Sequence, residues 1–178
     1  HQFKDAGVRA LVYLNTFGKS VQEVLPDSEI EYLIEARLGD MLPSLKGWLV
    51  NSVVKYVKKM VPPFKLPQAV RFNQALAQGK HMTLLEANPG PEDIAVLQYT
   101  GGTTGVSKGA VLLHRNIIAN LLQSEAWNSP LWKQIPDGEQ PVMVCALPLY
   151  HIFGFTINLM FGLRVGARNI LIPNQIGR

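Results

Sequence analysis

The sequence predicts an α/β fold in which a parallel-rich sheet is flanked by helices. Three segments near the start of the chain alternate in kind: Val8–Asn15 is predicted as a buried strand, Ser20–Leu25 as a short helix and Ile30–Ala36 as a second strand. This strand–helix–strand alternation favours a parallel sheet, because the helix carries the chain back to the same edge. Apolar residues make up 47% of the 178 residues, which suffices for a buried core of this kind.

The second half of the chain continues the alternation. Apolar residues at helical spacing predict a helix over Asn116–Trp127. Two prolines and an Asp-Gly pair predict a loop over 128–140, because these residues favour turns. The other expected elements are strands at Ile94–Thr100, Gly109–His114, Val142–Leu147 and Asn169–Ile172, and a helix at His151–Leu163.

Residues 41–85 are predicted to form a basic helical insert. The segment contains no Asp or Glu, and its basic residues are Lys46, Lys55, Lys58, Lys59, Lys65, Arg71 and Lys80. Apolar residues recur at helical spacing from Leu45 to Met60, and the pair Pro62-Pro63 ends that helix. A basic amphipathic helix with Trp and Tyr on its apolar side suits peripheral contact of residues 45–60 with a membrane surface. The alternative is an ordinary helix packed on its own domain with a solvated basic face.

Residues 99–109, which read Tyr-Thr-Gly-Gly-Thr-Thr-Gly-Val-Ser-Lys-Gly, are the most informative stretch of the chain. Glycines let backbone N–H groups approach a ligand closely, hydroxyls add donors, and Lys108 adds a positive charge, so a phosphate-binding loop is predicted. A flexible Gly/Thr hairpin between two strands is the alternative. The loop is not a Walker A loop, since Ser107 precedes the lysine, and it is not a dinucleotide fingerprint, since it contains no Gly-x-Gly.

Composition argues against several other classes of protein. The single cysteine, Cys145, excludes an internal disulfide framework and suits a reducing compartment, so a cytoplasmic location is expected. The four histidines lack the spacing of metal ligands. The basic residues are not interleaved with stacking aromatics, which argues against nucleic-acid binding. The long apolar tract at 142–172 is interrupted by Pro and polar residues and is therefore predicted as core elements rather than a membrane span.

A second motif, Leu-Pro-Leu-Tyr-His-Ile-Phe-Gly, lies at residues 147–154. Taken alone, His151 among apolar residues is more often a core histidine than a functional one. Together, however, the two motifs resemble those of the adenylate-forming superfamily of acyl-CoA synthetases, luciferases and peptide-synthetase adenylation domains. Its first motif is Tyr/Phe-Thr-Ser-Gly-Thr-Thr-Gly-x-Pro-Lys-Gly, from which this chain departs at Gly101 and Ser107. The Gly-Gly form looks like that of bacterial long-chain fatty acid:CoA ligases.

This resemblance implies a fold, a reaction and a set of site residues. Residues 1–178 would be part of the N-terminal AMP-binding domain of an enzyme that activates a long-chain fatty acid with ATP to acyl-adenylate and then acyl-CoA. ATP, Mg²⁺ and coenzyme A would take part, Thr103 would supply the hydroxyl on the Mg²⁺ side, and His151 would be the catalytic residue beside the acyl-adenylate. The nucleotide would be bound by Tyr99, Thr100, Gly101, Gly102, Thr103, Thr104, Gly105, Ser107, Lys108, Gly109 and Tyr150.

Other motifs of that superfamily do not occur in the sequence: a Tyr-Gly-x-Thr-Glu segment, a Thr-Gly-Asp segment and the C-terminal lysine domain. We therefore expect the chain to be a piece of a larger enzyme and to be inactive alone. The partners of that enzyme would be small-molecule substrates and not nucleic acid, with a homodimer and contact with the inner face of the membrane left open. Two alternatives also stay open, a short-chain or aryl-CoA ligase of the same superfamily and a non-catalytic interaction domain.

Overall fold

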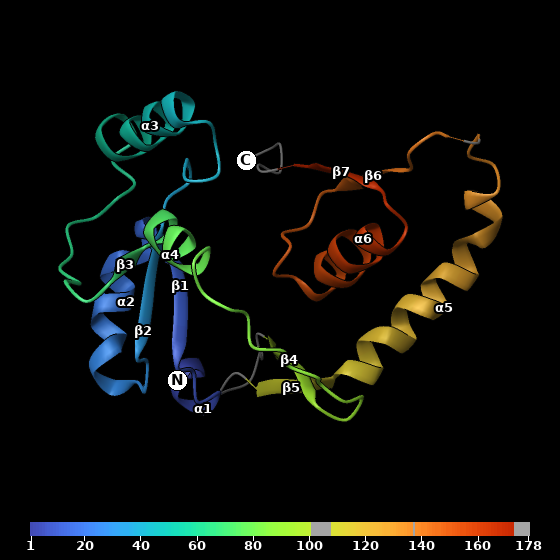
Figure 1. The fold of residues 1–178 in the computed structure, drawn as a ribbon, viewed down its shortest axis with the longest axis horizontal. Helices are drawn as coiled ribbons and strands as arrows, with labels where there is room; N and C mark the ends of the chain where they lie inside the picture. The colour runs from blue at the N-terminus through green and yellow to red at the C-terminus, as the bar shows by residue number, and fades with distance from the viewer. Residues whose placement is uncertain (101–107, 137, 173–178) are drawn as a thin grey trace. The chain divides into compact units, whose positions relative to one another are not determined.

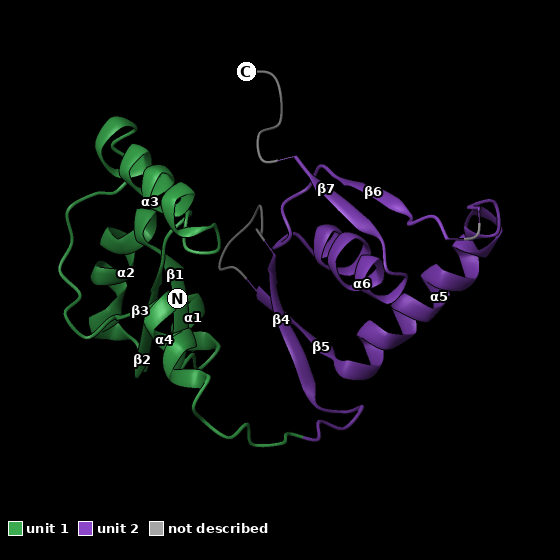
Figure 2. Ribbon diagram, turned by 45° about the horizontal axis from the view of Figure 1, so that its top comes forward, with its two compact units in different colours: residues 1–87 green, residues 88–178 purple. Residues whose placement is uncertain are grey.

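The computed structural model describes residues 1–100, 108–136 and 138–172 (Figure 1). The chain divides into two compact units, His1–Ala87 and Asn88–Arg178 (Figure 2). Each unit contains its own strands and covering helices.

Unit 1 is built on a three-stranded parallel sheet with the order β1-β2-β3. The register pairs Leu14 with Ala36 and Glu35 with Arg71. Two of these strands confirm the sequence-based prediction, including their parallel direction. The sequence does not predict the third, because two residues carry no periodic pattern. The strands are β1 (Ala10–Leu14), β2 (Tyr32–Ala36) and β3 (Val70–Arg71).

The helices of unit 1 lie before, between and after these strands. The predicted short helix is present, and Pro26 lies in the 3₁₀ turn that follows it. The helix predicted between Leu45 and Met60 is also present, as an α-helix that continues into a π-helical turn. The helical elements are α1 (Gln2–Asp5), η1 (Asn15–Phe17), α2 (Gly18–Val24), η2 (Leu25–Asp27), α3 (Ser44–Ser52), η3 (Val53–Val57) and α4 (Phe72–Gly79).

The core of unit 1 lies between the sheet and α2. Tyr13, Val21 and Leu33 are buried together, and the ring of Phe64 meets the ring of Tyr13 edge-on, with 6.5 Å between centroids. Burial raises the pKa of Tyr13 to about 12, and the nearby charge of Glu35 adds to the effect, so this phenol is neutral at pH 7. By contrast, the side chains of α3 and η3 are largely exposed.

Unit 2 contains two separate strand pairs. The strands that flank the glycine-rich loop, β4 and β5, are antiparallel, while β6 and β7 are parallel. All four were predicted within a few residues of their observed bounds. The elements are β4 (Ile94–Thr100), β5 (Lys108–Leu113), α5 (His114–Trp132), β6 (Val142–Cys145), η4 (Gly154–Phe161), α6 (Gly162–Arg164) and β7 (Arg168–Leu171).

One predicted boundary is wrong: α5 does not end at Trp127 but continues to Trp132, through residues expected to be loop. Pro130 lies inside the helix although it cannot donate a backbone hydrogen bond. Tertiary packing accounts for the difference, because the Trp132 ring lies 5.6 Å from the ring of Phe161, the most deeply buried large side chain of the described residues. Packing of the half-buried Trp132 ring against the buried Phe161 ring offsets the missing hydrogen bond.

An ion pair joins α5 and α6 in unit 2. The guanidinium of Arg164 in α6 lies 2.6 Å from the carboxylate of Glu125 in the middle of α5.

Over the described part of the chain, no helix combines the length and the apolar character needed to cross a membrane.

Candidate functional site

The β4–β5 pair holds the described ends of the glycine-rich loop. Tyr99 pairs with Gly109 and Thr100 pairs with Lys108 in the antiparallel register. The Tyr99 ring covers Gly109 so closely that a Cβ on this glycine would lie 3.0 Å from the ring. A side chain at this position would therefore require the Tyr99 ring to shift by a few tenths of an ångström. The expected phosphate-binding residues Gly101, Gly102, Thr103, Thr104, Gly105 and Ser107 lie outside the described residues.

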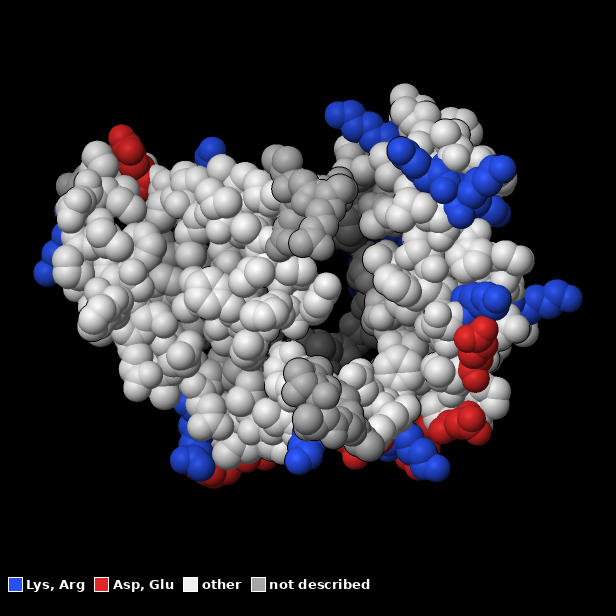
Figure 3. Space-filling model, turned by 180° about the vertical axis from the view of Figure 1, so that it is seen from behind, with Lys and Arg blue, Asp and Glu red and all other residues white. Residues whose placement is uncertain are grey.

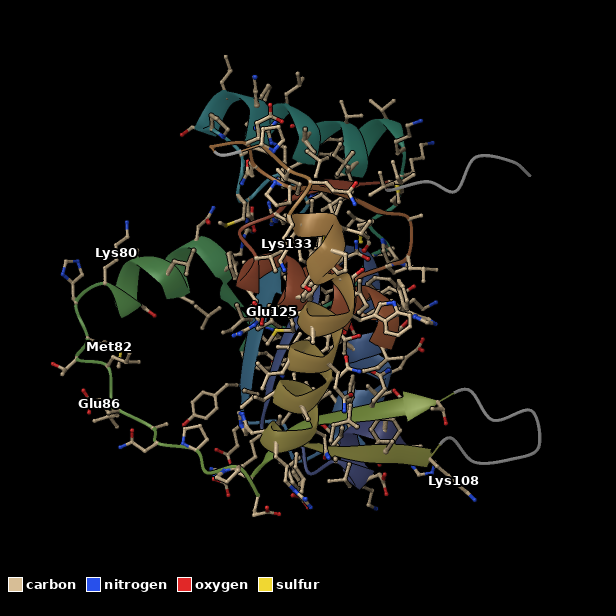
Figure 4. The ribbon with its side chains drawn as sticks, turned by 90° about the vertical axis from the view of Figure 1, so that its right-hand side faces the viewer. Lys80, Met82, Glu86, Lys108, Glu125 and Lys133 are labelled. Carbon is tan, nitrogen blue, oxygen red and sulfur yellow. The ribbon has the colours of Figure 1, made fainter. Side chains whose placement is uncertain are left out.

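Lys108 is the first residue of β5, and its side chain is exposed and extends outward from the strand pair (Figure 4). The other end of β5 leads directly into α5, where the backbone N–H of Leu113 donates to Oδ1 of Asn116 at 3.0 Å. The backbone of the lysine is thus held by its pairing with Thr100, while its side chain is exposed to solvent. Among the described residues its ammonium group forms no ion pair, so it is available to an anionic ligand.

The second motif forms the connection from β6 to η4. The backbone N–H of His151 donates to the carbonyl of Pro148 at 2.9 Å, and the carbonyl of His151 accepts from the N–H of Phe155 at 2.8 Å. The imidazole Nδ1 of His151 accepts from the backbone N–H of Phe153 at 3.3 Å. In the neutral ring, that contact leaves the proton on Nε2. His151 is exposed. It is therefore not a buried core histidine, which is what a lone histidine among apolar residues more often is.

Gly154 explains why this connection is compact. A Cβ on Gly154 would lie 2.5 Å from the carbonyl oxygen of Pro148, so only glycine lets η4 begin against the backbone of the motif. The close approach fixes the turn that presents Tyr150 and His151. Tyr150 is 83% exposed, which is high for an aromatic residue in an otherwise apolar segment.

A cavity of about 580 Å³ lies against this motif. It is lined by the end of β6, the motif backbone and the end of β7, with apolar side chains predominating. Cys145 is buried, and its Sγ contacts the carbonyl oxygen of Leu147 at 3.2 Å. The cysteine is therefore a packing residue, as its apolar surroundings in the sequence suggest. The lining residues are Cys145, Ala146, Leu147, Pro148, Leu149, Tyr150, Leu171 and Ile172.

A buried asparagine, Asn158, and a half-buried one, Asn169, join the elements around the cavity, and sequence reasoning did not assign them a role. Asn158 in η4 is 4% exposed and donates to the carbonyl of Val144 in β6 at 3.2 Å. Asn169 in β7 donates to the carbonyl of Asn158 at 2.8 Å. These bonds join β6, η4 and β7 inside unit 2. A polar residue inside a long apolar tract is the signal that points to such a role.

The structure thus places the candidate residues in two groups within unit 2. Tyr99, Thr100, Lys108 and Gly109 lie together on the β4–β5 pair, and Tyr150 and His151 lie together beside the cavity. Helix α5 follows β5 and packs on η4, so it links the two groups. In the part of the chain that the structure describes, no cluster of three or more His, Cys, Asp or Glu side chains could hold a metal ion.

A glycine-rich loop between paired strands and an apolar cavity beside an exposed Tyr-His pair together suit a phosphorylated ligand with an apolar group. The family model described as AMP-binding enzyme matches residues 1–177. The chain belongs to the AMP-binding enzyme family. This assignment confirms the superfamily that the two sequence motifs indicated, and it covers nearly the whole chain.

Several AMP-binding enzymes resemble the chain in more detail. The long-chain fatty acid–CoA ligase of Escherichia coli O157:H7 is 45% identical over 174 residues, which cover 98% of this chain and 30% of that protein. The 4-coumarate–CoA ligase 2 of Nicotiana tabacum is 31% identical over 127 residues, which cover 69% of this chain and 23% of that protein. The chain therefore spans about 30% of the length of the long-chain ligases it matches.

The fold of the family is confirmed by a solved structure. The crystal structure of an anthranilate CoA ligase in complex with anthranoyl-AMP aligns with a TM-score of 0.61 at 21% identity, over 98% of this chain and 28% of that protein. Similarity at this level of identity concerns the fold alone. It agrees with the predicted α/β class, in which parallel strands are flanked by helices.

Proposed function

We propose that the chain is part of the N-terminal AMP-binding domain of an enzyme that activates a long-chain fatty acid in two steps. In the first, a carboxylate oxygen of the fatty acid attacks the α-phosphorus of ATP, and the bond to pyrophosphate breaks, giving acyl-adenylate. In the second, the thiol of coenzyme A attacks the acyl carbon and AMP leaves. The observation that carries this proposal is the 45% identity to a bacterial long-chain ligase over 98% of the chain, both motifs included.

The residues of this chain would act by positioning and by electrostatics. Lys108, hydrated and exposed at the end of the strand pair, would balance phosphate charge, while the glycines and hydroxyls of residues 100–109 would donate to phosphate oxygens. Thr103 would provide the hydroxyl nearest to Mg²⁺, an ion that neutralises phosphate charge when bound. These roles rest on the residue types and their positions in the motif.

His151 and Tyr150 would lie beside the acyl-adenylate. Because Nδ1 of His151 accepts a backbone hydrogen bond, Nε2–H is the donor that remains for a ligand oxygen. The adjoining apolar cavity would receive the start of the acyl chain. Together these groups would orient the mixed anhydride for the second step.

The experiment that tests this proposal is fatty-acid-dependent ATP–pyrophosphate exchange by the intact protein, with acetate, octanoate, palmitate and a coumarate as acyl substrates. We expect exchange to be fastest with palmitate, because a long apolar chain offers more buried surface to the cavity. Fastest exchange with acetate or coumarate would assign a short-chain or aryl ligase instead. Absence of exchange with every acid would favour a non-catalytic interaction domain.

We also propose that the helix formed by α3 and η3 contacts an anionic membrane surface, where a long-chain substrate is available. The large apolar residues Leu45, Trp48, Leu49, Tyr56, Val57 and Met60 are 53–79% exposed, so they are not packed inside unit 1. In Figure 3, Lys and Arg side chains gather at the end of the unit that carries this helix. Exposed apolar and cationic groups on one helix match the chemistry of an anionic bilayer surface.

The double variant Lys58→Glu and Lys59→Glu is expected to weaken sedimentation with phosphatidylglycerol-containing vesicles by at least about thirty-fold, since each basic residue near an anionic leaflet contributes about 1 kcal/mol. The matched control is Lys4→Glu with Lys19→Glu, which makes the same charge change elsewhere in unit 1. Binding should also fall with added salt. Salt-independent binding, or equal loss in both double variants, would contradict the proposal.

A further inference from the structure

Unit 1 contains a second potential ligand site, at the carboxyl ends of its parallel strands. Asn15 follows the last residue of β1, Arg37 follows the last residue of β2, and Arg71 is the last residue of β3. In open parallel sheets, ligands bind in the crevice outside this edge of the sheet. Here the edge opens into a cavity of about 800 Å³ lined by Asn15 and Arg37 and an adjoining one of about 310 Å³ lined by Arg37 and Arg71.

The charged side chains of this edge are mostly positive. Arg37, Lys55, Lys65 and Arg71 line the two cavities against a single carboxylate, that of Glu35, so four positive charges minus one negative charge leave +3. The Glu35 carboxylate is only 12% exposed and binds both arginines through one oxygen, with Arg37 Nε at 3.1 Å and Arg71 Nη1 at 3.7 Å. It therefore orients the two guanidinium groups while it neutralises only one of them.

Helix α3 is held rigidly over this edge. Oδ1 of Asn51 accepts from the backbone N–H of Gly39 at 2.9 Å, and the Asp40 carboxylate accepts from the backbone N–H of Arg37 at 2.8 Å. Gly39 and Gly47 approach each other so closely that neither position has room for a side chain. The loop that carries Arg37 and the helix that carries Lys55 are thereby fixed before any ligand arrives, which lowers the entropic cost of binding.

The walls of the two cavities supply apolar and aromatic surface. The larger cavity is bounded by the segment from Val61 to Pro67, which contributes Phe64 and three prolines. The smaller cavity is bounded by the exposed rings of Trp48 and Tyr56, and Lys55 Nζ lies 5.2 Å from the Tyr56 ring centroid. A ligand that fits this site has a compact anion attached to an apolar or flat body.

We propose that the site binds a phosphomonoester carried on such a body, with Arg37, Arg71 and Lys55 holding the phosphate. Guanidinium groups match the geometry of phosphate oxygens, and the excess of positive charge favours a dianion over a singly charged ligand. The site goes beyond the proposed adenylation chemistry, whose residues all lie in unit 2. Two sources share the recognised chemistry, a soluble phosphorylated co-substrate and the headgroup of phosphatidic acid.

Calorimetric titration of the intact protein with phenyl phosphate tests the site directly. Arg37→Gln and Arg71→Gln are each expected to weaken binding about ten-fold or more, the loss typical of one charge-assisted contact. Lys55→Gln is expected to weaken it several-fold and breaks no ion pair among the described residues, so it keeps the test valid if an arginine variant misfolds. Lys19→Gln, an exposed lysine that lines neither cavity, is the control for net charge.

Lys108→Ala separates this site from the glycine-rich loop, since it should leave phenyl phosphate binding by Arg37 and Arg71 unchanged. Loss of binding in Lys108→Ala with retention in Arg37→Gln and Lys55→Gln would overturn the inference and leave the proposed adenylation site intact.

Vesicles of phosphatidylcholine containing either phosphatidic acid or phosphatidylglycerol identify the source of the phosphate group. Selective loss of phosphatidic acid binding in Arg37→Gln assigns the lipid headgroup, and unchanged vesicle binding with weakened phenyl phosphate binding assigns a soluble ligand.

Discussion

Replacement of Lys108 by alanine in the intact enzyme is expected to lower fatty-acid-dependent ATP–pyrophosphate exchange by about ten-fold to a hundred-fold. The estimate follows from the roughly 1.5–3 kcal/mol contributed by one charge-assisted contact to a phosphate oxygen. The lysine is exposed, so its removal creates no cavity and should leave the free energy of unfolding nearly unchanged. The effect should therefore fall on catalysis alone.

Two variants make this result specific. Lys133→Ala removes an exposed lysine from the end of α5 and should leave exchange unchanged (Figure 4). Lys108→Arg keeps the charge but changes its shape, and it should recover part of the lost rate. Wild-type exchange in Lys108→Ala would show that the 99–109 segment is a hairpin without a role in phosphate binding.

Gly154→Ala is expected to lower both the free energy of unfolding and the exchange rate. The added Cβ would lie 2.5 Å from the Pro148 carbonyl oxygen, and both groups belong to the backbone turn of the second motif. Overpacking of this kind costs about 1–3 kcal/mol. Relief of the contact must move either η4 or the turn that presents Tyr150 and His151, so molecules that remain folded should also form adenylate more slowly.

Gly90→Ala is the matched control within unit 2, because a Cβ there would meet Asp93 at an ordinary 3.7 Å. Denaturant unfolding and pyrophosphate exchange, measured on both variants, separate stability from activity. If Gly154→Ala were as stable and as active as Gly90→Ala, the close approach of η4 to the motif would have no structural importance.

Both motifs of the candidate site can be predicted from residues that are close together in the sequence. The residue types at 99–109 indicate a phosphate-binding loop and the 147–154 segment indicates its companion, because both depend on glycine, hydroxyl and charged groups close together in the chain. The family match over residues 1–177 confirms the family that the two motifs indicate, while their roles in binding stay predictions. The cavity beside His151 and the asparagine bonds across β6, η4 and β7 could not be predicted, because they join residues that are distant in sequence.

The α/β alternation, most strands and the basic helix can be predicted from local sequence patterns, because periodicity and turn residues act within a few positions. Only the tertiary structure decided that α5 continues through Pro130, since the contact of Trp132 with Phe161 outweighs the local preference of proline. The contact of both Arg37 and Arg71 with the carboxylate of Glu35 is also visible only in the tertiary structure. Parallel register brings strand ends together whatever their separation along the chain, and no local pattern records that meeting.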